Sequence, residues 1–410
     1  MSLTRRRRRP SNPLWVITLL VLIAAAWYFN KAVVPTLPAM FEPTPTATRS
    51  PESFVNEAEN LYKSGKLKQA IDQYKQAIFV DPKNPAIYIA MARVMVFNGQ
   101  YEDARKAAEE ALILNPDNSM AYAVKGWALN FIGDYLEAEG AVNKALEIDP
   151  NNALAYAYLA EILLDRGYPE DLETAIVKSH KAQELAPNQL ETHRVRGYVL
   201  WKTQNFEDAI TEYKAAMALN DKLWDLHYSL GTVYWSMGAN DPEMYSLAVQ
   251  EFLSAGALNP TNPDILTMAS RTELAAGQYG KAAQYAEQAV NIEPSNPRLH
   301  AYLGYMYYKN NQYDRAAEEL SLFVRGGKTA EGTVVKGVPL APGTVADHYS
   351  IYSLALSKTG LCNDAVQVAQ LVLQNIAEDQ DAYFNAQTAI ETCQKSAASS
   401  SEATETPATP

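Results

Sequence analysis

The chain has 410 residues, 48% of them hydrophobic and 20% charged, so it is long and apolar enough to bury a sizeable core. Its net charge is −12, and because five of the positive charges are Arg5 to Arg9, the rest of the chain carries −17. So acidic a body disfavours nucleic acid as a partner, since binding phosphates needs a basic surface. The two cysteines form no CxxC or Cys/His cluster, which argues against a zinc site, and no other metal or cofactor is predicted.

Residues 14–34 predict a transmembrane signal-anchor that follows a basic, cytoplasmic segment, 1–13. The run from Leu14 to Phe29 carries no charge, and as a helix it spans roughly 24 Å, slightly short of a hydrocarbon layer of about 30 Å. Extending the helix to Val34 makes it long enough, with Lys31 reaching the interface. The arginine cluster favours a cytoplasmic N-terminus and an extracytoplasmic body at the cell membrane.

A cleaved signal peptide is the alternative for the same residues. Ala24, Ala25 and Ala26 follow the apolar core and offer a cleavage site near Ala26, which would make the body a secreted protein. The apolar run continues past these alanines into Trp27, and this favours retention of the helix. Both alternatives send the body across the membrane. Residues 35–50, rich in proline and threonine, then predict an extended linker.

A period of 34 residues follows the linker. Glycines recur at Gly65, Gly99, Gly133 and Gly167, prolines at Pro82, Pro116 and Pro150, and alanines at Ala70, Ala104 and Ala138. A fixed period of this length indicates one supersecondary unit copied along a solenoid. In the first copy, the pattern predicts helices over residues 53–64 and 67–80, separated by Gly65. The predicted fold is therefore all-α.

The repeat resembles the tetratricopeptide repeat (TPR), a helix-turn-helix unit of this length. In the second copy the residues that match its signature are Tyr88, Ala92, Gly99, Tyr101, Ala104, Ala111 and Pro116. The resemblance implies a right-handed α-solenoid of about nine TPR units with a C-terminal capping helix. Repeats 1–8 cover 51–325, repeat 9 and the capping helix cover 346–395, and the tail 396–410 is predicted to be disordered.

Residues 326–345 interrupt the repeats. Two short β-like runs, 333–336 and 337–340, predict a hairpin or an ordered loop at this insertion.

The resemblance also implies a binding surface, because the first helices of such units line the inner face of the solenoid. The family's ligand-facing positions here are Tyr62, Arg93, Phe97, Trp127, Phe131, Tyr198, Trp201, Tyr228, Trp235, Tyr305 and Tyr308. Tyrosine and tryptophan are enriched at binding hot spots, so this face predicts a protein or peptide partner. A glycan stacked on the aromatic rings is a weaker alternative.

No pattern of catalytic residues remains outside the repeats, and the chain is predicted not to be an enzyme. His193, His227 and His300 each occupy the fourth position of a unit, where other copies carry tyrosine, so packing residues are favoured over metal ligands. Cys362 lies at the turn of the ninth unit and Cys393 near the end of the capping helix. The stacking of such units implies that the two sulfurs meet, and an exported protein would keep the resulting disulfide.

These features together predict a membrane-tethered, extracytoplasmic TPR scaffold that binds a protein or peptide on an aromatic concave face. The alternative is a cell-envelope accessory protein for polysaccharide binding, export or assembly.

Overall fold

The computed structural model describes residues 12–33, 49–376 and 378–404 and divides the chain into two units, Met1–Ser50 and Pro51–Pro410. Most of the predicted linker and most of the basic N-terminal segment lie outside the described residues. Each unit is considered by itself.

The described helix of the first unit is α1, Pro13–Tyr28, continued by a π-helical turn, η1, Phe29–Val33. Asn12 caps it, since its side-chain oxygen accepts a hydrogen bond from the Leu14 amide at 3.3 Å. Residues Pro13–Ala32 are long and apolar enough to cross a membrane, and none of them is buried within the structure. A signal sequence has the same length and composition.

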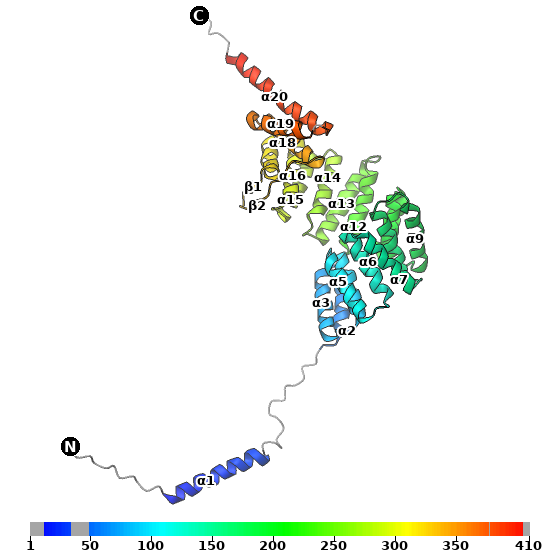
Figure 1. The fold of residues 1–410 in the computed structure, drawn as a ribbon, viewed down its shortest axis with the longest axis vertical. Coiled ribbons are helices and arrows are strands. Elements are labelled where there is room, and N and C mark those ends of the chain that lie inside the picture. The colour runs from blue at the N-terminus through cyan, green and yellow to red at the C-terminus, as the bar shows by residue number, and fades with distance from the viewer. Residues whose placement is uncertain (1–11, 34–48, 377, 405–410) are drawn as a thin grey trace, which may run out of the picture. The chain divides into compact units, whose positions relative to one another are not determined.

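The second unit is a succession of helical hairpins (Figure 1). The first helices of the hairpins are α2 (Pro51–Lys63), α4 (Pro85–Phe97), α6 (Ser119–Ile132), α8 (Ala153–Asp165), α10 (Leu190–Lys202), α12 (Trp224–Met237), α14 (Pro263–Ala275), α16 (Pro297–Lys309) and α18 (Thr344–Lys358). Their partners are α3 (Leu67–Val80), α5 (Tyr101–Leu114), α7 (Tyr135–Ile148), α9 (Asp171–Leu185), α11 (Phe206–Leu219), α13 (Glu243–Leu258), α15 (Tyr279–Ile292), α17 (Tyr313–Val324) and α19 (Cys362–Asn375). The capping helix is α20, Gln380–Thr404. The all-α solenoid predicted from the repeat is confirmed.

Residues at the helix ends fix where each hairpin turns. Asparagine side chains cap α4, α6, α8, α14 and α16 by accepting a backbone hydrogen bond in the first turn. Gly65 has φ of +72°, and a Cβ there would lie 2.5 Å from the Lys222 carbonyl oxygen. At the corresponding turns of two other repeats, Gln204 and Asn311 adopt the left-handed conformation instead.

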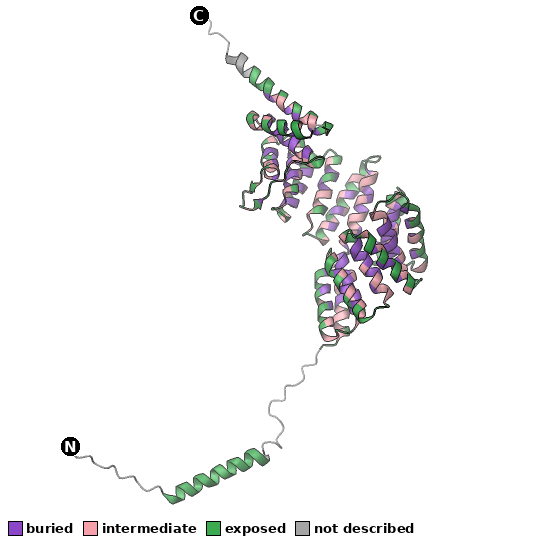
Figure 2. Cartoon of the chain, viewed as in Figure 1, coloured by how far each residue is buried: buried purple, intermediate pink, exposed green. Residues whose placement is uncertain are grey.

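Small residues let the two helices of a hairpin pack closely, so that each helix has a buried side (Figure 2), and most of the buried residues are apolar. A Cβ at Gly126 would lie 2.4 Å from a methyl carbon of Val142, so only glycine fits where α6 crosses α7. The buried apolar residues form two clusters, one from Ala58 to Ala269 and the other from Ala282 to Cys393. The solenoid thus has an N-terminal and a C-terminal core that divide between α14 and α15.

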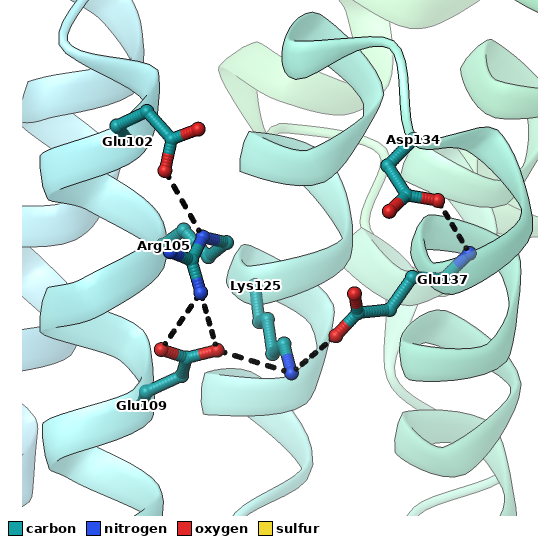
Figure 3. A network of polar contacts seen from close by, with 6 residues as sticks. All are labelled: Glu102, Arg105, Glu109, Lys125, Asp134 and Glu137. Carbon is teal, nitrogen blue, oxygen red and sulfur yellow. Dashed lines mark hydrogen bonds and ion pairs between the residues drawn. The ribbon is translucent and has the colours of Figure 1, made fainter.

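Charged side chains link neighbouring hairpins on the surface (Figure 3). Lys125 of α6 bridges Glu109 of α5 at 3.2 Å and Glu137 of α7 at 2.8 Å. The hydrogen bond with Lys125 lowers the pKa of Glu137. Arg105 joins the network by binding Glu109 at 2.9 Å. Exposed pairs of this kind contribute little individually.

The insertion forms a short hairpin between α17 and α18. Strands β1 (Gly327–Lys328) and β2 (Val334–Val335) pair antiparallel. The predicted β-like run 337–340 is not a strand: the Val338 amide donates to the Phe323 carbonyl at 2.8 Å, and the Val338 carbonyl accepts from the Tyr349 hydroxyl at 2.7 Å. These bonds to α17 and α18 replace strand pairing.

The C-terminal end also differs from the prediction. The tail was predicted to be disordered from residue 396, but α20 continues to Thr404. Alanine is the best helix former and serine an intermediate one, so this composition can continue the helix. Residues 405–410 lie outside the described part of the chain.

Candidate binding surface

Aromatic side chains of the first helices fill the inner face of the N-terminal repeats. The rings of Trp127 and Tyr158 stack with centroids 4.6 Å apart, and Phe97 meets Trp127 edge-on at 5.0 Å. Tyr62 continues the row, 6.0 Å from Phe97. Phe97, Trp127 and Tyr158 are only 3%, 1% and 0% exposed. These rings therefore pack against one another and do not face solvent.

Two ion pairs, one buried and one half-buried, lie beside this aromatic row. Arg194 donates two hydrogen bonds to Glu161, of 2.9 and 2.5 Å, and its guanidinium lies 5.3 Å from the centre of the Trp127 ring. The Trp127 indole donates to the same carboxylate at 3.1 Å. Arg93 forms the second pair, with Glu191. Burial alone would raise the pKa of Glu191, but Arg93 lowers it overall, so this carboxylate stays ionised.

The turn between α11 and α12 reaches back to the first two repeats. The Trp224 indole donates to the Phe97 carbonyl at 2.8 Å, and the Asn220 amide donates to the Tyr62 carbonyl at 3.4 Å. These bonds join residues 127 and 158 positions apart in the sequence. They close the N-terminal repeats on themselves and enclose the aromatic row and the ion pairs.

Asp225, in the first turn of α12, lies in this enclosed interior. Burial raises its pKa, Arg194 lowers it and Glu161 raises it, and the net pKa is about 6. Its Oδ1 atom is buried and accepts no hydrogen bond from the described residues. The interior thus holds a carboxylate whose charge is poorly compensated.

The prediction of an accessible concave face is wrong for Phe97 and Trp127, since both are buried in this interior. Arg93 is half-buried and already holds Glu191. Sequence reasoning missed Glu161 and Arg194, although Glu161 interrupts the apolar sequence Leu159 to Leu164. A charged residue in so apolar a helix indicates a buried partner.

Four more predicted residues lie outside any common site. Tyr198 donates to Asp165, and the Trp201 indole donates to Ser236 at 2.9 Å. Tyr228 packs against Phe252 with the ring centroids 5.5 Å apart. Phe131 is 38% exposed and stacks on Tyr101 at 4.8 Å. Tyr198 and Trp201 lie beside each other, with ring centroids 5.8 Å apart, but the structure does not bring all four side chains together.

An open groove lies among the first helices of the C-terminal repeats. Its cavity of about 910 Å³ is lined by side chains from α12, α14, α16, α18 and α20. The remaining predicted residues, Trp235, Tyr305 and Tyr308, all line it. Tyr302 and Phe384 extend the aromatic surface, and Phe384 is 68% exposed. Here the aromatic positions leave a space large enough for several side chains of a ligand.

Charged side chains of both signs also line the groove. Arg271 of α14 and Lys309 of α16 are cationic, and the Lys309 ammonium lies 5.4 Å from the centre of the Tyr305 ring. Asp347 of α18 and Asp381 of α20 are anionic. In the part of the chain that the structure describes, none of these four charges forms an ion pair with another residue. Sequence reasoning missed all four, because it selected mainly aromatic residues at the ligand-facing positions, although Arg271 occupies the same position of its repeat as Tyr305.

The β1–β2 hairpin does not line this groove. With α15 and α17 it borders a different cavity of about 870 Å³, to which Lys328, Thr329 and Glu331 contribute.

The three histidines at the fourth position pair with glutamates of their own hairpins. In each pair the ring Nδ1 lies 2.6 Å from a carboxylate oxygen: His193 with Glu212, His227 with Glu251 and His300 with Glu319. The other ring nitrogen of His300 donates to the Pro294 carbonyl at 2.9 Å, much as the Tyr88 hydroxyl donates to the Pro82 carbonyl at 3.2 Å. No cluster of histidine, cysteine or acidic residues fit for a metal occurs among the described residues.

The two cysteines lie together at the C-terminal end. Cys362 begins α19 and Cys393 lies on α20, and the structure joins them in a disulfide with a Cα–Cα distance of 5.4 Å. The bond ties α20, which forms one wall of the groove, to the preceding hairpin.

Family models of known helical repeats match several segments of this chain. Models described as tetratricopeptide repeat match residues 61–128, 121–152, 141–177 and 273–323, and a model described as TPR repeat matches 197–238. Together they cover about half of the chain and fall within the hairpins described above.

Individual proteins show weaker similarity. BBSome complex member BBS4 from Bos taurus is 27% identical over 150 residues, which are 37% of this chain but only 27% of that protein. Type IV pilus assembly protein PilF from Pseudomonas aeruginosa is 23% identical over 186 residues, 44% of this chain and 72% of that protein. The chain thus spans about a quarter of the first relative and most of the second.

Solved structures share the fold. The human IFIT1 dimer with PPP-AAAA aligns with a TM-score of 0.55 and 17% identity, over 83% of this chain and 82% of that chain. The APC/C hetero-tetramer Cut9–Hcn1 aligns with a TM-score of 0.54 and 16% identity, over 66% of this chain and 52% of that chain. At such identities the likeness shows the fold alone. The chain belongs to the tetratricopeptide repeat family, whose members generally serve as scaffolds for protein–protein interaction rather than as enzymes.

Proposed function

We propose that this protein is a membrane-tethered scaffold that holds a segment of a partner protein in the groove between α12 and α20. The observation that carries the proposal is the contrast between the two inner faces. The N-terminal face is occupied by its own side chains, whereas Trp235, Tyr305 and Tyr308 border an unfilled cavity of about 910 Å³. Aromatic side chains in a groove provide large contact area at low entropic cost.

Binding is tested with the full chain in detergent micelles and fluorescent peptides derived from proteins of the same membrane. The double variant Tyr305→Ala/Tyr308→Ala is expected to weaken binding at least about tenfold, because hot-spot truncations cost 2 kcal/mol or more. Phe131→Ala is the matched control, since Phe131 is an exposed aromatic residue of the N-terminal repeats. Equal affinity of the double variant and the wild type would argue against the groove.

The tether is the second part of the proposal. The apolar helix Pro13–Ala32 follows Arg5 to Arg9, and this order favours a cytoplasmic N-terminus with the repeats on the other side of the membrane. The Cys362–Cys393 disulfide agrees with an oxidising compartment. The mass of the protein isolated from native membranes tests retention. A chain that begins after Ala26 would instead make it a secreted protein.

A second candidate is an accessory role in assembly or export at the cell envelope. The similarity to a protein named for type IV pilus assembly favours it, since that relative is matched over 72% of its length. Crosslinking in native membranes from a photoreactive residue at Tyr308 distinguishes the candidates. Recovery of a component of an envelope assembly supports the accessory role, and recovery of polysaccharide alone contradicts both protein-binding candidates.

A further inference from the structure

The charges of the groove are sorted by helix. Both cations, Arg271 and Lys309, come from α14 and α16, and two anions, Asp347 and Asp381, come from α18 and α20. The aromatic side chains of α12 and α16 lie in the same groove. A ligand that spans it therefore passes from a positive to a negative wall over an apolar surface.

The negative wall is poorly compensated from within. Asp347 is half-buried, and burial raises its pKa, an effect to which nearby Asp379 and Asp381 add. His348 acts in the opposite direction, but burial lowers its own pKa and favours the neutral imidazole. A cationic group placed among these carboxylates would relieve their mutual repulsion.

The positive wall is equally uncompensated. The Lys309 ammonium contacts the face of Tyr305 and no carboxylate among the described residues. Arg271 is exposed and lies close enough to Tyr302 to lower the pKa of that hydroxyl, although burial raises it to about 12 overall. Guanidinium and ammonium groups bind carboxylates well in such a setting.

We propose that the groove binds an extended peptide segment of mixed charge, with an acidic group against Arg271 and Lys309 and a basic side chain against Asp347 and Asp381. The two walls lie one or two helix spacings apart, each of about 8–10 Å, and an extended chain rises about 3.3 Å per residue, so roughly three to six residues separate the two charges. The intervening residues are apolar and lie on the aromatic surface. This inference rests on the proposed function and specifies the partner.

Uniformly charged ligands fit less well. A purely acidic segment would meet Asp347 and Asp381 as well as a body that is acidic overall. A purely basic segment would bring its second charge against Arg271 and Lys309. Like charges at these distances reduce affinity, most strongly at low salt.

Four labelled peptides with the same apolar spacer of four residues test the proposal by fluorescence polarisation on the full chain in detergent micelles. Their flanking residues are Lys and Glu, Lys and Lys, Glu and Glu, or Gln and Gln. The mixed peptide is expected to bind about fivefold or more tightly than the others at low salt, since each pair contributes up to about 1 kcal/mol.

Charge-reversal variants sharpen the test. Asp347→Lys/Asp381→Lys should move the preference to the Glu and Glu peptide, and Arg271→Glu/Lys309→Glu should move it to the Lys and Lys peptide. Arg271, Lys309 and Asp381 are exposed and Asp347 is half-buried, so the folded state is expected to survive, and thermal unfolding checks this.

The outcomes distinguish the proposed charge pattern from the proposed binding function of the groove. If all four peptides bind equally and Tyr305→Ala/Tyr308→Ala still removes binding, the charge pattern is wrong and the proposed function stands. If no peptide binds folded protein at millimolar concentration, both are overturned.

Discussion

The N-terminal and C-terminal repeats use the same positions of the same unit to build two different inner faces. Position nine of the unit is Trp127 in repeat 3, where it is 1% exposed, and Tyr305 in repeat 8, where it lines an open groove. The difference arises from contacts between distant repeats: Trp224 reaches back to Phe97 and closes the N-terminal face. A repeat position therefore fixes which way a side chain points, but the closure between distant repeats decides whether a ligand can reach it.

The largest expected loss of stability comes from a substitution in the enclosed N-terminal face. Glu161→Ala leaves the Arg194 guanidinium buried without its carboxylate, and we expect a loss of about 3–5 kcal/mol in unfolding free energy. Urea unfolding of the full chain in micelles measures it. The matched control is Asp347→Ala in the groove, which removes an unpaired carboxylate and should cost less than about 1 kcal/mol. Equal losses of unfolding free energy would contradict the distinction between an enclosed N-terminal face and an open C-terminal groove.

Loss of the disulfide should destabilise only the helices at the C-terminal end of the groove. Cys362→Ser opens a loop of 31 residues, and we expect a loss of about 2–4 kcal/mol confined to α18–α20. Hydrogen exchange should therefore rise in α20 and remain unchanged in α4 and α6. Two reactive thiols in the native, unreduced protein would show that the bond is absent.

The charge of Asp225 should make the enclosed face sensitive to pH. Its folded pKa of about 6 is above the ordinary value of 3.8, so the folded state binds the proton more tightly and its stability falls as pH rises from about 4 to about 6. Asp225→Asn removes this cost. We expect it to stabilise the protein by up to about 3 kcal/mol at pH 7.5 and to have little effect at pH 4.

A pH-independent effect of Asp225→Asn in thermal unfolding would contradict the buried charge. The corresponding change in the groove, Asp381→Asn, serves as the control, since Asp381 is exposed and should show no such dependence.

The smallest effect concerns a pair common to both regions. Burial alone would lower the pKa of His300, but its hydrogen bonds to Glu319 and the Pro294 carbonyl raise it overall. The stabilisation is fully present below the unfolded pKa of about 6.5 and is lost as pH rises through the higher folded value. His300→Gln should cost about 1 kcal/mol at pH 5.5 and less at pH 8.5.

His227, whose pKa is raised by its hydrogen bond to Glu251, should behave in the same way in the N-terminal half. A difference between His227→Gln and His300→Gln would show that the two regions differ even in the interior of their hairpins.

The repeat made the fold predictable from sequence because each hairpin depends on residues close together in the chain. Gly65 and the proline ladder gave the first hairpin within two residues, and the position of Cys362 and Cys393 followed from how hairpins stack. The closure could not be predicted, since the bond from Trp224 to Phe97 joins residues 127 positions apart with no period between them.

The charges of the groove could be predicted only in part: Arg271 occupies the same position of its repeat as Tyr305, but the sequence does not show that Asp381 lines the same groove. Arg271 and Asp381 belong to different repeats, and Asp381 lies on the capping helix, where the repeat pattern has ended. Only the packing of α14, α16, α18 and α20 brings them to one cavity.

Thiol labelling of single-cysteine replacements tests the contrast between the two faces most directly. Phe97→Cys, Phe131→Cys and Tyr305→Cys are treated with a maleimide in native, unreduced protein, where the natural cysteines are bonded. We predict that Tyr305→Cys reacts at a rate close to that of the exposed control, Phe131→Cys, and that Phe97→Cys reacts only when the N-terminal repeats open. Rapid labelling of Phe97→Cys in folded protein would contradict a closed N-terminal face and the assignment of binding to the C-terminal groove.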